Sequence, residues 1–129
     1  MVQAALPWQA GYAPANPQGP VSLYIHIPFC AQKCPYCDFN TYAGLGALYD
    51  ETVDALCTEM AQWGSRLGGR PIETIFLGGG TPTVLGAAQL QRLFAAVRAH
   101  FTLVDGCEIT SEANPGTVDQ ATFVTLRDL

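Results

Sequence analysis

The sequence has 129 residues, of which 49% are hydrophobic and 13% charged, and its formal net charge is −5. This composition is typical of one globular domain, and six singly scattered basic residues argue against nucleic acid or a membrane surface as partner. No apolar run approaches the roughly 18 residues that cross a bilayer. The first Lys or Arg is Lys33, so the charged start of a signal peptide is missing. We therefore expect a cytoplasmic protein, in which clustered cysteines serve metal binding or catalysis.

The first twenty residues differ in composition from the rest of the chain. They are rich in Pro, Gly, Ala and Gln and show no hydrophobic period, so we expect residues 1–20 to form a flexible tail. The alternative is that Trp8 and Tyr12 pack onto the folded body. Residues 21–129 are expected to form one domain.

Strand-like and helix-like segments alternate after the tail. The β-branched and aromatic run at 21–27 (VSLYIHI) predicts a buried strand. A helix is predicted over 45–67, because apolar side chains recur there at steps of three and four and share one face. These side chains are Leu45, Leu48, Leu56, Met60, Trp63 and Leu67. Gly68 and Gly69 end this helix, and Pro71 prevents its return.

The alternation continues through the second half of the domain. Residues 72–77 (IETIFL) predict a second strand, which runs directly into a glycine-rich loop at 78–83 (GGGTPT). A second helix is predicted over 87–100 from its apolar period. A third strand is predicted at 107–113 (CEITSEA).

A break at Asn114–Pro115 separates this strand from a third helix, which is predicted to begin near Val118 with Thr117 as its N-cap. The order is therefore βαβαβα, the α/β class, which implies a parallel sheet that is either flat or a segment of a barrel. In both architectures ligands bind beyond the carboxyl ends of the strands. The cysteines, the glycines and Glu112 all fall at that edge, so we expect a functional site there.

Three of the five cysteines, Cys30, Cys34 and Cys37, stand in one loop with the spacing C-x3-C-x2-C. Thiolates are soft ligands that suit iron–sulfur clusters and zinc. Three of them leave a cubane cluster with one iron open to a small molecule. A structural zinc uses four ligands, and His26 is the candidate fourth. Free thiols are the remaining alternative.

The other candidate ligands carry weaker signals. His26 points to the same side of its strand as Tyr24, and a lone strand histidine is usually structural. Its position four residues before the first cysteine leaves a role beside the site as the alternative. Cys57 and Cys107 stand apart, and we expect both to be small buried hydrophobic side chains.

The glycine loop at 78–83 has neither the lysine of a phosphate-binding P-loop nor the spacing of a dinucleotide site. Three glycines at a strand end allow a ligand to approach the backbone closely, and exposed amides there bind carboxylates. An ordinary glycine-rich turn is the alternative. Glu112 can accept hydrogen bonds from ribose hydroxyls or an ammonium group, with an ordinary salt bridge as the alternative.

The combination of these motifs resembles the radical S-adenosylmethionine (SAM) proteins, whose cluster loop has the same cysteine spacing and an aromatic residue, here Tyr36, before the last cysteine. More narrowly, LYIHIPFCAQKCPYCDF, FLGGGTPT and SEANPGT are similar to the group that holds the oxygen-independent coproporphyrinogen III oxidases and the HemW heme chaperones. The resemblance covers 21–129. It implies the N-terminal part of a partial (β/α)6 barrel with a [4Fe–4S] cluster at its carboxyl rim.

The resemblance also implies a role for each matching residue. Three irons of the cluster are ligated by Cys30, Cys34 and Cys37, and SAM chelates the fourth iron through its amino and carboxylate groups. The residues implied to contact this SAM are Tyr24, Gly79 and Glu112. The residues that match positions near a second SAM in the oxidase are Tyr36, Gly80 and Thr81.

One position separates the two kinds of relative. The oxidases have the pattern C-x3-C-x2-C-x-C, but the place of the extra cysteine is taken here by Phe39, in a CDF ending similar to the HemW group. That group is understood to bind heme and pass it to acceptor proteins. We therefore favour a heme chaperone with a cluster and a SAM site, and heme as its cargo. The alternatives are a coproporphyrinogen III oxidase, which is an enzyme acting on a porphyrinogen, and a zinc-stabilised interaction module.

The chain ends at Leu129, inside or just past the third predicted helix. Three parallel strands make a small core, and the last of them is an unprotected edge. We therefore expect the N-terminal portion of a longer protein, truncated before the later barrel strands and the C-terminal part that complete the heme site. On its own this portion is expected to be only marginally stable.

Overall fold

The computed structural model describes residues 18–129, so Trp8, Tyr12 and almost all of the predicted tail lie outside the described residues. The strands are β1 (Val21–Ile27), β2 (Phe29–Cys30), β3 (Tyr42–Ala43), β4 (Ile72–Gly79) and β5 (Leu103–Ser111). The α-helices are α1 (Tyr49–Leu67), α2 (Ala87–His100) and α3 (Gln120–Asp128). Two short 3-10 helices, η2 (Gly46–Leu48) and η3 (Pro82–Val84), precede α1 and α2.

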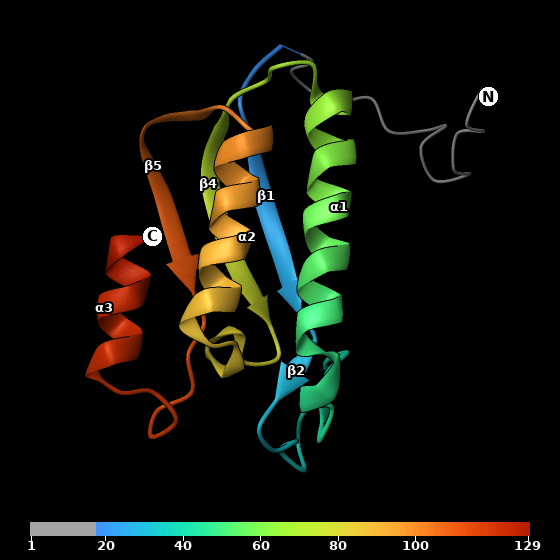
Figure 1. Cartoon of the computed structure of the whole chain (residues 1–129), viewed down its shortest axis with the longest axis vertical. Coiled ribbons are helices and arrows are strands. Elements are labelled where there is room, and N and C mark those ends of the chain that lie inside the picture. Colours follow the sequence, from blue (N-terminus) through green and yellow to red (C-terminus); the bar gives the residue numbers. More distant parts are fainter. Residues whose placement is uncertain (1–17) are drawn as a thin grey trace, which may run out of the picture.

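The main sheet has the strand order β1-β4-β5, and both neighbouring pairs are parallel. Figure 1 shows α1 and α2 lying across one face of this sheet, with α3 beside β5. The strands β2 and β3 form a separate short parallel pair next to the carboxyl end of β1. The alternating order and the parallel pairing confirm the predicted α/β class. No helix in the described part of the chain is long and apolar enough to span a membrane.

The core lies between the sheet and the two helices that cover it. Alternate residues of β1 and β4 point into it, and Ile25, Ile27, Ile75 and Leu77 are each at most 3% exposed. Burying an aliphatic side chain of this size contributes about 1.5–3 kcal/mol. From α2, Leu90, Leu93 and Val97 complete the packing with 1% exposure or less. The sheet therefore has one packed face and one face that these helices leave open.

The first helix differs from its prediction at its N-terminal end. It begins at Tyr49, after the 3-10 turn, so Leu45 and Leu48 lie before it and are 38% and 42% exposed. The prediction that these two leucines share the buried face of the helix is therefore wrong. The predicted apolar set had no member between Leu48 and Leu56, and the buried side chain in that interval is Val53, which is 1% exposed.

The third strand begins at Leu103, four residues earlier than predicted, and ends at Ser111. While β4 advances from Ile72 to Thr74, β5 advances from Leu103 to Glu108, so the early part of β5 is bulged. Gly106 adopts a φ of +73° within this bulge. The sequence did not predict the start of this strand, because the turn-forming residues of the bulge interrupt the alternation of apolar and polar side chains.

The third helix begins at Gln120, and its N-cap is Asp119 rather than Thr117. The Asp119 carboxylate accepts a hydrogen bond from the Thr122 amide at 2.8 Å. The Thr117 hydroxyl instead donates to the Asn114 carbonyl at 2.7 Å, within the turn that ends the strand region after β5.

The helix α2 occupies its predicted range, and β4 runs two residues further than predicted, through Gly79.

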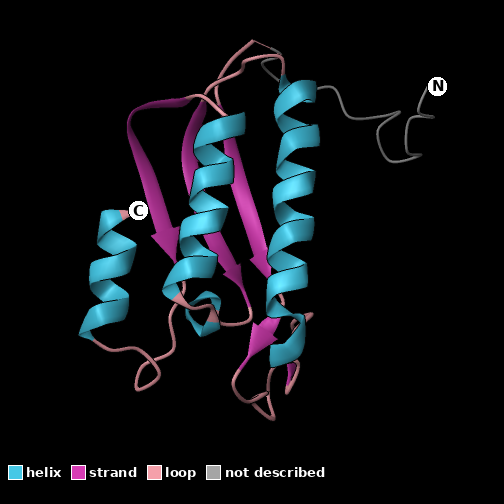
Figure 2. Cartoon of the chain, in the orientation of Figure 1, coloured by secondary structure: helices cyan, strands magenta, loops and turns pink. Residues whose placement is uncertain are grey.

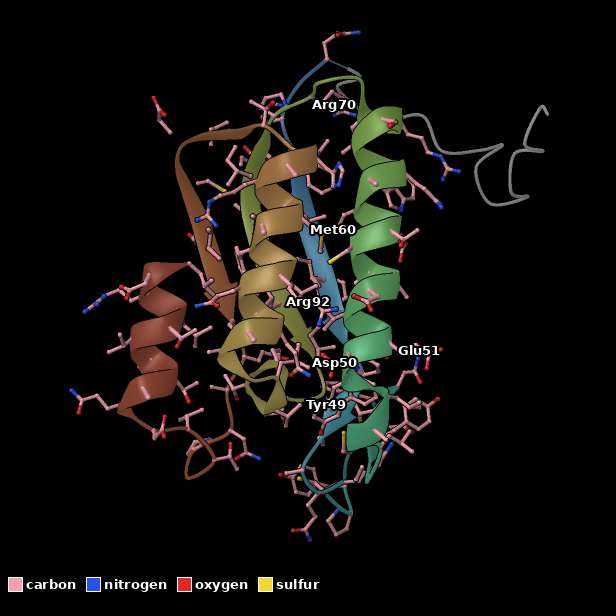
Figure 3. All side chains as sticks on the ribbon, viewed as in Figure 1. Tyr49, Asp50, Glu51, Met60, Arg70 and Arg92 are labelled. Carbon is pink, nitrogen blue, oxygen red and sulfur yellow. The ribbon has the colours of Figure 1, made fainter. Side chains whose placement is uncertain are left out.

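Charged side chains join α1 to α2 close to the end of α1 that follows the cysteine loop. Arg92 of α2 donates to Asp50 at 2.9 Å and also to Asp54, and Figure 3 shows Arg92 and Asp50 pointing toward each other. Cys57 and Cys107 pack against the core but are only partly buried, less than the sequence predicted. Burial raises the pKa of both thiols, which favours their protonated, unreactive form.

Candidate functional site

The loops that follow β1, β4 and β5 all leave the sheet at the same edge, as Figure 2 shows. Backbone hydrogen bonds tie these loops together. The Gly80 amide donates to the Ile27 carbonyl at 2.8 Å, and the Thr81 amide donates to the Phe29 carbonyl at 2.7 Å. The glycine loop is therefore fastened directly to the chain that leads into Cys30.

The cysteine loop presents its three thiols without a disulfide. Cys30 ends β2, while Cys34 and Cys37 belong to a turn in which the Cys37 amide donates to the Cys34 carbonyl at 3.0 Å. All three side chains are partly exposed. The hydrogen bond between Tyr36 and the Cys34 thiol, together with the negative charge that this thiol can carry, raises the pKa of the Tyr36 phenol.

The His26 ring links two parts of the site by hydrogen bonds, which its position in the sequence did not predict. Its Nε2 lies 3.0 Å from the Asn40 carbonyl, which can only accept, so Nε2 carries the proton. The Tyr24 hydroxyl lies 2.8 Å from Nδ1 and donates to it in the tautomer that carries its proton on Nε2. Both ring nitrogens are occupied, so His26 is not placed to be a fourth metal ligand.

Two glycines are required by close contacts at this edge. A Cβ on Gly79 would lie 2.6 Å from the His26 Cε1, and the φ of Gly79 is +110°. A Cβ on Gly80 would lie 2.3 Å from the Phe29 carbonyl oxygen and 3.0 Å from the Cys30 sulfur. Any side chain at either position would therefore push the glycine loop away from β1 and the cysteine loop.

A pocket of about 270 Å³ opens beside these glycines. It is lined by Tyr24, His26, Phe39, Asn40, Phe76, Gly79 and Glu112. The Tyr24 and Phe76 rings stack with centroids 6.2 Å apart and planes at 27°. Glu112 reaches the same wall, where its Oε2 accepts from the Gly79 amide at 3.2 Å. The pocket thus combines a flat aromatic surface, a carboxylate and close backbone.

A second, larger cavity of about 740 Å³ lies along β1 and α1. Of the candidate site residues, only Tyr24 and His26 line it: its walls contain no cysteine of the loop, no glycine of the GGGTPT segment and not Glu112. Volume alone therefore does not locate the site. The smaller pocket at the carboxyl edge is the better candidate, because Tyr24, Gly79 and Glu112 all line it.

Comparison with known proteins agrees with this geometry. The family model of the Radical SAM superfamily matches residues 24–129. The chain belongs to the radical SAM superfamily. It is 49% identical over 106 residues to the heme chaperone HemW of Escherichia coli K12, covering 81% of this chain and 28% of that protein. It is 41% identical over 120 residues to HemW of Mycobacterium tuberculosis H37Rv, covering 91% and 30% respectively.

A solved radical SAM structure shows the same arrangement. Coproporphyrinogen III oxidase (HemN) from Escherichia coli superposes with a TM-score of 0.81 at 34% identity, over 88% of this chain and 26% of that chain. The chain thus spans between a quarter and a third of the length of the relatives that it matches. The prediction that it corresponds to the N-terminal part of a radical SAM domain is confirmed.

The donor set fits the cluster that the radical SAM superfamily implies. The loop offers three thiols, and among residues 18–129 no group of three or more His, Cys, Asp or Glu side chains converges on one metal ion. A single zinc ion would need four converging ligands, and His26 is otherwise engaged. In a cubane cluster the thiolates bind different irons, so three separated thiols suffice. The close approach of Gly80 to the Cys30 sulfur also leaves that side of the loop free of side chains.

The structure brings most of the predicted site residues together. Tyr24, Gly79 and Glu112 line the same pocket. Gly80 and Thr81 lie beside Cys30, and the Thr81 hydroxyl donates to the Cys30 sulfur at 3.7 Å. Tyr36 stays apart from the pocket on the cysteine loop, with 88% of its surface exposed.

Three residues at the site were missed by sequence reasoning. Phe76 was treated only as part of a strand, although the alternation in IETIFL places it on the face opposite Ile75 and Leu77. Lys33 contributes through side-chain bonds to the Phe39 and Thr41 carbonyls, and Asn40 through its own backbone carbonyl, which pairs with His26. No sequence period signals such bonds.

Proposed function

We propose that this chain is the N-terminal part of a HemW-like heme chaperone that holds a [4Fe–4S] cluster on Cys30, Cys34 and Cys37 and binds SAM in the adjoining pocket. The observation that carries the choice of function is Phe39. This residue stands where the oxidase pattern has an extra cysteine, and it forms a wall of the pocket with 66% of its surface exposed. Similarity to HemW proteins of several bacteria supports the same choice.

The pocket residues suit the parts of SAM. When bound, the cluster supplies electron transfer and an open iron for the amino and carboxylate groups of SAM. The stacked rings of Tyr24 and Phe76 offer an apolar, planar surface for the adenine. Glu112, held by the Gly79 amide, retains free lone pairs for ribose hydroxyls. The exposed backbone at Gly79 allows the ligand to lie close to the chain.

Heme is proposed as cargo that passes to an acceptor protein, with SAM and the cluster as resident cofactors. Because the chain spans about 28% of its HemW relative from Escherichia coli, the heme site is proposed to need residues of the full-length protein as well. The same proposal places the protein in the cytoplasm, where the five free cysteines stay reduced.

Heme titration tests this proposal. The full-length protein is reconstituted anaerobically with iron and sulfide, and heme is added while the Soret absorbance is recorded. We expect saturable binding near one heme per chain and transfer to an apo-heme protein. A protein with a complete cluster that gives no Soret change would overturn the chaperone proposal.

Coproporphyrinogen III oxidase activity is the second candidate, favoured by the close structural likeness to HemN. Incubation of the reconstituted protein with coproporphyrinogen III, SAM and a reductant distinguishes the two. We expect no protoporphyrinogen to form. Product formation would replace the chaperone by the oxidase, and metal analysis that finds zinc in place of iron would replace both by a zinc-stabilised module.

A further inference from the structure

Lys33 is the only lysine in the 129 residues, and it directly precedes Cys34 in the cysteine loop. Its ammonium group donates to the Phe39 carbonyl at 3.1 Å and to the Thr41 carbonyl at 3.1 Å. A long, flexible side chain loses rotamer freedom when it is held at both ends, so two simultaneous hydrogen bonds to the backbone mark a defined position for it.

The segment that Lys33 holds is the return of the cysteine loop. Three consecutive carbonyls in it accept hydrogen bonds from side chains, because the Asn40 carbonyl between the two bonded to Lys33 accepts from His26. Peptide carbonyls outside a helix or sheet need such partners or water. The Lys33 and His26 side chains therefore supply hydrogen bonds to three consecutive carbonyls of this return.

The segment bonded by Lys33 also contacts one of the three thiols. Thr41 is 2% exposed, and its hydroxyl lies 4.0 Å from the Cys37 sulfur. The Cys37 amide in turn donates to the carbonyl of Cys34, the residue next to Lys33. The Lys33 bonds therefore close the segment from Lys33 to Thr41, and the Cys34–Cys37 turn lies within this closed segment.

We propose that Lys33 is a positioning residue for the iron–sulfur cluster: it closes the cysteine loop so that Cys34 and Cys37 keep their spacing, and it places a fixed positive charge in that loop. The inference rests on the proposed function, since it presupposes that the three thiols bind a cluster. Asp38 is the one other charged residue in the sequence between Cys30 and Ala43. Nearby positive charge favours the reduced, more negative state of a cluster and raises its reduction potential.

The test compares three variants of the full-length protein after anaerobic reconstitution. Lys33→Met removes the donors and the charge, Lys33→Arg keeps both, and Arg127→Met removes one positive charge from the exposed end of α3 as the matched control. Cluster release to an iron chelator is followed by absorbance, and the reduction potential is measured by a titration monitored by electron paramagnetic resonance. Amide exchange of residues 34–43 is measured on the cluster-free forms.

For Lys33→Met we expect cluster release about tenfold to a hundredfold faster, the range seen when partners of metal ligands are removed. We also expect a lower reduction potential and faster amide exchange in the loop. Lys33→Arg and the Arg127→Met control are expected to stay near wild type. If Lys33→Met keeps the wild-type release rate and potential in a protein that does take up iron and sulfide, the role of Lys33 is overturned while the proposed function stands. If wild type takes up no cluster, the proposed function itself has failed.

Discussion

The two faces of the three-stranded sheet differ in burial: one packs against helices, and the other lines the candidate pocket. On the face covered by α1 and α2, the strand residues are aliphatic and buried: Ile25, Ile27, Ile75 and Leu77. On the opposite face, Tyr24 is 55% exposed and Phe76 is 40% exposed, and both line the candidate pocket. Consecutive residues of a strand point to opposite faces, so the same strands stabilise the fold on one side and build the site on the other. Substitutions on the two faces should therefore separate stability from ligand binding.

The largest expected effect on stability is on the packed face. Leu77→Ala leaves a cavity between the sheet and the helices at a fully buried position, and we expect a loss of about 2–5 kcal/mol in the free energy of unfolding. Urea denaturation followed by circular dichroism measures this loss. The neighbouring Phe76→Ala is the matched variant on the open face, and it is expected to cost about 1 kcal/mol while weakening SAM binding. Equal stability losses for the two variants would show that the faces are not divided in this way.

A glycine at the boundary between the two faces gives the next effect. Gly79→Ala combines a positive φ with a contact of 2.6 Å to the His26 ring, so we expect a loss of about 1–3 kcal/mol and a displaced His26. Gly116→Ala is the control, because its φ is also positive (+83°) but no atom lies within 4 Å of an added Cβ. Thermal unfolding of both variants should show the larger shift for Gly79→Ala. Identical shifts would mean that the close approach to His26 is unimportant.

The hydrogen bonds of the open face give a smaller effect. Tyr24→Phe keeps the ring stacked on Phe76 but removes the hydroxyl that donates to His26. We expect a loss of about 0.5–1.5 kcal/mol, with the His26 proton remaining on Nε2 because of the Asn40 carbonyl. Nitrogen NMR of the imidazole reports the tautomer. A proton found on Nδ1 in the wild type would contradict the hydrogen-bond order described for this side chain.

The smallest effect lies outside both faces, at the start of α3. Hydrogen bonds from the Thr122 amide and hydroxyl lower the pKa of the Asp119 carboxyl. A lowered pKa means that the charged carboxylate stabilises the folded state above the ordinary Asp value of about 3.9. This contribution is lost as the pH falls through the lower folded value. The protection factors of the α3 amides, which correct the exchange rates for the intrinsic effect of pH, should therefore fall on acidification in the wild type and change less in Asp119→Ala. Equal acid responses would remove Asp119 as the cap.

The parts of the fold that the sequence predicted are those with an unbroken local pattern. The range of α2 was predicted correctly because its apolar period is complete and its first turn carries Gln89, whose side chain accepts from the Gly86 amide at 2.8 Å. The start of β5 was missed because the bulge around Gly106 breaks the period of two. The cap of α3 was misplaced because Thr117 and Asp119 are both acceptable caps, and only the turn at Asn114 decides between them.

The candidate site was predictable where motifs carry the chemistry, as at Cys30, Cys34 and Cys37. It was not predictable where side chains bond to the backbone of distant residues. The role of His26 depends on the Asn40 carbonyl fourteen positions away, and that of Lys33 on the carbonyls of Phe39 and Thr41. Such contacts depend on how the loop returns to the strand, which hydrophobic patterning does not encode.

We propose that Cys30, Cys34 and Cys37 hold a cluster whose open iron receives SAM in the adjoining pocket. Electron paramagnetic resonance of the reduced, reconstituted full-length protein, recorded with and without SAM, tests it most directly. We expect about four irons per chain and a cluster signal that shifts on addition of SAM, with both lost in Cys34→Ala. A cluster whose signal is unchanged by saturating SAM, or one that survives in Cys34→Ala, would contradict it.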